Sequence, residues 1–152
     1  GSAYDEVHEK IVHAMLDRMS NDSARAVTLA ASARQAAESQ ALVSFSCLAT
    51  AVEAAARVDI GEVHTGILLA TTALGSIAAI QGSEFGLEIC VICWDTLRRA
   101  GSPQAIEAKR VTLARIAQIV SHIRDPRLKS LFFNRSVVRL VLDEAKPQTS
   151  VS

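Results

Sequence analysis

The stretch Leu97–Pro103, which reads LRRAGSP, ends one predicted helix and begins the next. Gly101 follows the apolar period of the preceding segment, and glycine is favoured just past a helix C-terminus. Ser102 is a common N-cap residue, and Pro103 then takes the first helical position, where its missing N–H costs nothing. Asp125-Pro126 repeats the signal of a cap followed by proline. These signals predict long helices joined by short turns.

Between the turns, apolar residues recur at three- and four-residue spacing, and strand-like alternation is almost absent. The pattern predicts an all-α chain with helices at about 4–19, 24–38, 40–58, 62–80, 84–100, 103–123, 126–133 and 137–145. The residues of the first helix expected to face inward are Val7, Ile11, Val12, Met15 and Leu16. Turns of two to four residues make sequential helices antiparallel neighbours.

The turn signals are also periodic. Gly61 and Pro103 open corresponding helices, a step of 42 residues, and the same step aligns the small residues of positions 24, 66 and 108. A period of this size is typical of solenoids built from helix pairs. We therefore expect one domain over residues 3–145, with at least six antiparallel helices stacked as a right-handed superhelix. Gly1-Ser2 resembles a remnant of an expression tag, and residues 146–152 are expected to be a disordered polar tail.

The C-terminal part of the chain carries a family resemblance. It rests on Leu87-Glu88, LRRAGSP at 97–103, IRDPRL at 123–128, Phe132, Arg135 and Val138. Together these resemble the end of degenerate tetratricopeptide-repeat (TPR) arrays in large bacterial signalling proteins, such as TPR-tailed serine/threonine kinases and multidomain ATPase-type regulators. The resemblance covers about residues 40–144. It implies a TPR-like superhelix with a C-terminal capping helix, and it implies protein–protein binding.

The capping segment is expected to begin at Arg124-Asp125-Pro126. Terminal repeats of a solenoid need a cover because they would otherwise expose an apolar face. The side chains expected to provide that cover are Leu128, Leu131 and Phe132.

Composition narrows the class of partner. Lys plus Arg total 16 and Asp plus Glu total 16, so no overall field favours nucleic acid. Three cysteines, an odd number, argue against a disulfide framework and favour the reducing cytoplasm. The apolar run 67–80 is shorter than the ~20 residues that span a membrane, so it predicts a buried helix.

Motifs for catalysis or metal binding are weak. Cys90 and Cys93 form a C-x-x-C, which can be a redox or metal pair, but it lies in mid-helix among apolar residues and no second pair completes a tetrahedral site. The pattern therefore favours core cysteines. None of the histidines at 8, 13, 64 and 122 pairs with another at a spacing of four, and phosphate-binding loops are absent. The sequence predicts no catalytic residue, cofactor or metal, with an enzyme or small-ligand sensor as the minor alternative.

Helices 40–58 and 84–100 are predicted to line the concave groove of the superhelix. Trp94 has two interpretations, a core residue between repeats or an aromatic anchor in that groove, because interface hot spots favour Trp and Arg. The candidate partner-binding residues are Ser46, Thr50, Glu53, Arg57, Glu88, Trp94, Asp95, Arg98 and Arg99.

Their mixed charges suit a protein or peptide partner, and we expect Glu53 and Arg98 to contribute to its binding. The sequence therefore predicts a non-catalytic scaffold within a larger bacterial signalling protein. A homodimerising, self-association module of a kinase or transcription regulator is the alternative.

Overall fold

The computed structural model describes residues 2–80 and 85–145, and over these residues the chain is helical with no strand. The elements are α1 Ala3–Met19, α2 Ser23–Ser39, α3 Val43–Asp59, α4 Val63–Gly75, the 3-10 turn η1 Ile77–Ile80, α5 Gly86–Arg99, α6 Ala105–Ser121, α7 Pro126–Phe133 and α8 Ser136–Ala145. The all-α prediction is confirmed for this part of the chain, and the predicted 62–80 helix is divided into α4 and η1. The expected break at 81–83 and the expected tail lie outside the described residues.

The turns between helices repeat one backbone motif. Asn21, Ala41, Gly61 and Gly101 all have positive φ, at 62°, 57°, 89° and 69°. The N–H of the residue after each one donates to the carbonyl five residues earlier, over 2.7, 2.8, 2.8 and 3.0 Å. This is the Schellman end of a helix, in which a left-handed residue reverses the chain.

The spacing of these residues corrects the predicted repeat length. Gly61 corresponds to Gly101, so a helix pair spans 40 residues rather than 42. The 42-residue step holds only between the starts of α4 and α6. α6 begins later than the 40-residue repeat requires because Ser102 is not its N-cap. The Ser102 Oγ accepts the N–H of Gln104 over 3.2 Å, and the helix begins at Ala105.

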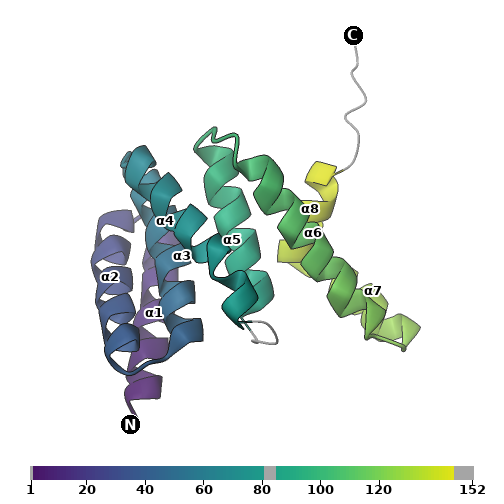
Figure 1. Ribbon diagram of the computed structural model, residues 1–152, viewed down its shortest axis with the longest axis horizontal. Coiled ribbons are helices and arrows are strands. Elements are labelled where there is room, and N and C mark those ends of the chain that lie inside the picture. The colour runs from purple at the N-terminus through teal and green to yellow at the C-terminus, as the bar shows by residue number, and fades with distance from the viewer. Residues whose placement is uncertain (1, 81–84, 146–152) are drawn as a thin grey trace.

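The helices follow one another as pairs (Figure 1). α1, α3 and α5 contact one another in that order, while α2 lies against α1 and α3, and α4 lies against α3 and α5. α3 is the central helix, and its alanines are buried on several sides. Close packing also depends on Gly66 of α4, where an added Cβ would lie 2.5 Å from Val58 Cγ2 and 2.9 Å from the Ala54 carbonyl oxygen.

The inward face predicted for the first helix is only partly right. Val7, Ile11 and Ala14 are buried. Val12, Met15 and Leu16 are instead exposed. The helix has a wider apolar surface than α2 and α3 cover, which periodicity alone does not reveal.

The C-terminal cap also differs from the prediction. Asp125 caps α7 by accepting the Arg127 N–H over 2.8 Å, as predicted, and Phe132 is buried. Leu128 and Leu131 are exposed, because α7 projects from the end of α6. The cover comes mainly from α8, which packs on α5 and α6 and buries Val138 and Val141.

Among the described residues, no helix is both long and apolar enough to cross a membrane.

Candidate interaction surface

The four candidates on α3 do not form one exposed row. Glu53 is only 2% exposed, and its carboxylate receives Arg34 Nε over 3.2 Å and Arg57 Nε over 2.8 Å. Thr50 is buried and donates to the Ser46 carbonyl over 2.8 Å. Glu53 therefore joins α2 to α3 inside the fold, and the expectation that it faces a groove is wrong.

Arg57 extends the same network. Besides its bond to Glu53, its Nη1 donates to Glu62 Oε2 over 2.8 Å at the start of α4. The pKa of Arg57 is raised above its ordinary value, chiefly by the hydrogen bond to Glu53. Its guanidinium is therefore held by two carboxylates.

Of the candidates on α5, Trp94 belongs to the core. The indole is 2% exposed, and Arg98 lies over it with its guanidinium carbon 5.1 Å from the ring centroid. The structure thus supports the first of the two interpretations of Trp94. Glu88 lies earlier on α5 and pairs with Arg135 over 3.4 Å, near the C-terminal helices.

The remaining α5 candidates form a charged cluster at the end of that helix. Asp95 binds both Arg98 and Arg99. Arg99 also donates a hydrogen bond to Asp59 over 2.7 Å, and Arg18 donates to the other carboxylate oxygen of Asp59 over 2.8 Å. Cations at helix C-termini also interact favourably with the helix dipole. The cluster therefore ties the ends of α1, α3 and α5 together, and its charges are largely satisfied within the chain.

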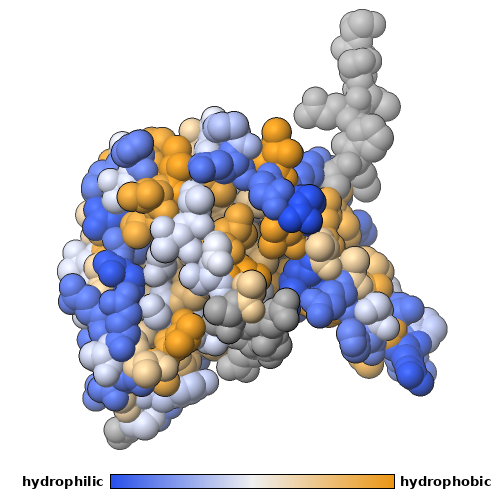
Figure 2. Space-filling model, viewed as in Figure 1, coloured by the Kyte–Doolittle hydropathy of each residue, from blue (hydrophilic) through white to orange (hydrophobic). Residues whose placement is uncertain are grey.

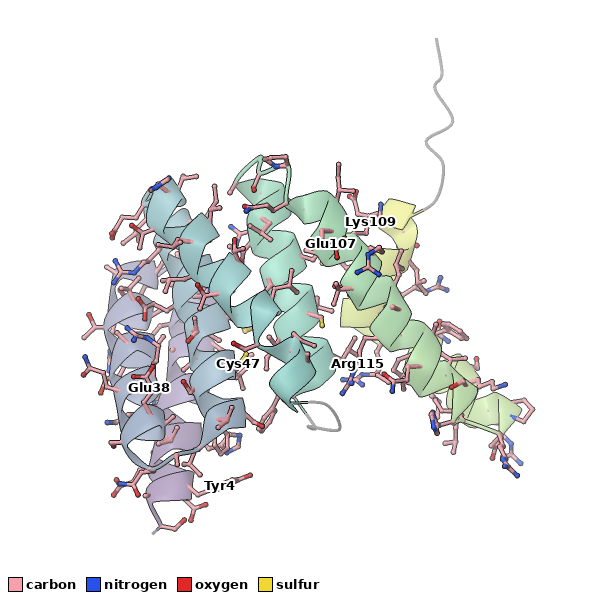
Figure 3. The ribbon with its side chains drawn as sticks, viewed as in Figure 1. Tyr4, Glu38, Cys47, Glu107, Lys109 and Arg115 are labelled. Carbon is pink, nitrogen blue, oxygen red and sulfur yellow. The ribbon has the colours of Figure 1, made fainter. Side chains whose placement is uncertain are left out.

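Ser46 and Thr50 lie instead on the wall of a groove of about 380 Å³ between α2, α3 and α4. Figure 3 labels two other residues of its lining, Glu38 of α2 and Cys47 of α3. It is lined by Ala37, Glu38, Ala41, Leu42, Val43, Ser46, Cys47, Thr50, Thr72, Ala73 and Ser76. Val43, on its rim, is 57% exposed. This groove is not apparent from the sequence because its walls come from three helices. The one local signal of the groove is Val43, an apolar residue at the first position of α3.

The groove is more apolar than its lining suggests. The hydroxyls of Thr50, Thr72 and Ser76 donate to carbonyls one turn earlier on their own helices. Such back-bonding hides a hydroxyl from a ligand. Among the described residues, the Ser46 hydroxyl makes no hydrogen bond of its own, so it is free to orient a ligand.

A second hollow adjoins the first. It is lined by Tyr4, Phe45 and Phe85 together with residues 41–44, so both hollows share Ala41, Leu42 and Val43. The Phe45 ring centroid lies 4.6 Å from that of Tyr4 and 5.1 Å from that of Phe85. The start of α3 therefore has an aliphatic groove on one side and aromatic rings on the other.

The cysteines are buried and free, as predicted for the core. Burial raises the pKa of both Cys47 and Cys90 to about 11, and it raises that of Cys93 well above 9.0. The Cys47 thiol, on the groove wall, donates to the Ala73 carbonyl over 3.3 Å. These thiols are protonated at neutral pH and are poor nucleophiles. Within residues 2–80 and 85–145, no group of three His, Cys, Asp or Glu side chains could hold a metal ion.

No protein-family model matches the chain, and neither a curated protein nor a solved structure matches it.

Proposed function

We propose that this chain is a non-catalytic protein–protein interaction scaffold that binds an apolar segment of a partner beside Val43. The proposal includes a TPR-like, right-handed stacking of the helix pairs and a place within a larger cytoplasmic bacterial signalling protein. The sequential contacts of α1, α3 and α5 support the stacking. Three free, buried thiols agree with a reducing compartment.

The groove between α2, α3 and α4 is the observation that carries the proposal. Its hydroxyls are mostly bonded to their own helices, and its rim carries an exposed valine. Interfaces draw most of their binding energy from a few apolar or aromatic side chains that fill such pockets. We infer that a partner inserts one aliphatic or aromatic side chain here, and that Ser46 bonds the adjacent peptide backbone.

Charge is not the main contribution in this mode of binding. The ion pairs of Arg57, Arg98 and Arg99 already satisfy those side chains within the chain. A partner that competed for them would break bonds that hold the fold together. The proposed surface therefore shifts from the predicted row of charges to the start of α3.

The test is a peptide-display selection on the intact chain, followed by affinity measurement on variants. Val43→Asp puts a charge on the groove rim, and Ser46→Arg fills the wall. We expect selected peptides to share one large apolar residue, and we expect each substitution to weaken them at least about tenfold, near 1.4 kcal/mol. Ile106→Asp is the matched control, because Ile106 is an exposed apolar residue of α6 outside the groove.

Two results would count against the proposal. Peptides that bind the Val43→Asp and Ser46→Arg variants as tightly as the parent chain would place the site elsewhere. A selection that enriches no sequence would argue against peptide binding by this groove.

A further inference from the structure

The outer side of α1 carries a regular seam of exposed residues. Asp5, Glu9, Val12, Leu16 and Met19 follow one another at spacings of four, three, four and three, which places them on one face of the helix. All are exposed, with Leu16 at 53% and Met19 at 80%. We call these five residues the acidic–apolar edge, since two carboxylates precede three apolar side chains.

A complementary edge lies at the α6–α7 turn and on α7. Arg124, Arg127, Leu128 and Leu131 are exposed; Leu131 lies four residues after Arg127 and three after Leu128 on one face of α7, and Arg124 lies in the turn just before the N-cap Asp125. Within the described parts of the chain, neither guanidinium makes an ion pair. We call these four residues the basic–apolar edge.

The two edges cannot meet within one molecule. α1 and α7 lie at opposite sides of the fold in Figure 1. The end of the molecule formed by the α6–α7 turn projects from the rest, and its tip is strongly hydrophilic in Figure 2. In both edges the charged residues come first along the chain and the apolar residues follow. Two copies can therefore lie with α1 of one parallel to α7 of the next, so that carboxylates meet guanidiniums and apolar side chains meet each other.

We propose that these edges bind each other between copies, so that the chain associates head to tail. The occupant of each exposed edge is then a second copy of this chain. An antiparallel pair of α1 helices fits less well. It would turn Glu9 toward Met19, where the neighbouring Arg18 is already bound to Asp59 at 2.8 Å. It would also leave Arg124 and Arg127 without a partner.

This contact is heterologous, so it leaves one free edge at each end and permits open growth. A short α7 makes the contact small, and small contacts are weak and transient. Association should therefore rise steadily with protein concentration and fall with salt, because the charged pairs are exposed and screened. It is independent of the groove beside Val43.

Sedimentation velocity on two singly blocked variants tests the proposal. Leu16→Asp blocks the α1 edge, and Leu131→Asp blocks the α7 edge; both side chains are exposed, so the fold is expected to persist, checked by circular dichroism. Each variant alone should stay monomeric at concentrations where the parent chain forms a series of oligomers. An equal mixture of the two should form a heterodimer and nothing larger, because each pair has only one working contact.

Charge exchange gives a second readout. Glu9→Arg and Arg127→Glu should each weaken association at least about tenfold, and the double variant should recover it. A parent chain that stays monomeric up to about 1 mM would overturn the proposal. So would a Leu131→Asp variant that still dimerises alone, which is the result of pairing through α1 only.

Discussion

Asp59 and Arg99 are 40 residues apart in the sequence, and Asp59 Oδ1 lies 2.7 Å from Arg99 Nη1 in the fold. The second carboxylate oxygen binds Arg18 over 2.8 Å and receives the Ser23 hydroxyl over 3.1 Å. One carboxylate thus joins the ends of three helices that belong to three successive pairs. Two of these residues, Asp59 and Arg99, are the last residues of α3 and α5, so the contact reports the 40-residue repeat directly.

Asp59→Asn should lower the free energy of unfolding by about 1–2 kcal/mol, because it removes two charge-assisted hydrogen bonds from a partly exposed site where water screens the charges. Urea unfolding at pH 7 measures the change. Glu6→Gln on α1 is a control, since it removes an exposed carboxylate away from this contact. An equal effect of the two substitutions would contradict the role of Asp59.

The same contact predicts a dependence on pH. Burial opposes ionisation of Asp59, but the hydrogen bonds and charges of Arg18 and Arg99 together outweigh it and hold its pKa below the ordinary 3.8. A lowered pKa in the folded state stabilises the fold fully above the unfolded pKa, and this contribution is lost as the pH falls through the folded pKa. The stability difference between the parent chain and Asp59→Asn should therefore be constant near neutral pH and shrink below about pH 4.

Ala41 has a left-handed conformation that glycine adopts more readily. Its φ of 57° matches the turn position held by Gly101 at 69°. Ala41→Gly should raise the free energy of unfolding by up to about 1 kcal/mol, and Gly101→Ala should lower it by about 1 kcal/mol. An added Cβ at Gly101 has no atom within 4 Å, so the second effect isolates backbone strain. Thermal or urea unfolding of both variants gives the signs, and like signs would refute a shared turn.

Gly66 is expected to be intolerant of a methyl group. The Cβ of Gly66→Ala would meet Val58 and the backbone of Ala54 at the crossing of α3 and α4. We expect a loss of about 1–3 kcal/mol as the helices move apart. Gly75→Ala in the same helix is the matched control, since its Cβ meets nothing within 4 Å and alanine favours a helix. Comparable unfolding curves for the two variants would mean that the helices do not approach closely at Gly66.

Glu53 is expected to act on stability rather than on partner binding. Glu53→Ala leaves the guanidiniums of Arg34 and Arg57 without their shared carboxylate, so the free energy of unfolding should fall by about 3 kcal/mol or more. Glu107→Ala breaks a fully exposed pair with Arg110 and should leave the melting curve unchanged. A Glu53→Ala variant that melts like the parent chain would argue against this network.

The helices could be located from sequence because their end signals are local. Asp125-Pro126 marks the start of α7, and the predicted bounds of most helices agree with the structure within about two residues. The repeat length was harder to obtain, since α6 begins two residues later after Gly101 than α4 does after Gly61, and this made Pro103 look equivalent to Gly61.

The candidate site could not be read from periodicity for a different reason. Glu53 looked like an exposed polar residue, but its partner Arg34 comes from another helix 19 residues earlier. Periodicity shows which side of a helix is apolar, not which side a neighbour covers. That limit also explains why Leu16 was expected inside and lies outside, and why the groove beside Val43 was not found.

Peptide binding in the groove beside Val43 is tested most directly by titrating the isotopically labelled chain with a selected peptide and following the backbone amide chemical shifts. We expect the largest shifts around the groove, at Val43, Ser46, Cys47 and Ala73, with little change at Ile106. Largest shifts on α1 or α7, or no shifts at peptide concentrations that give binding by another method, would contradict it.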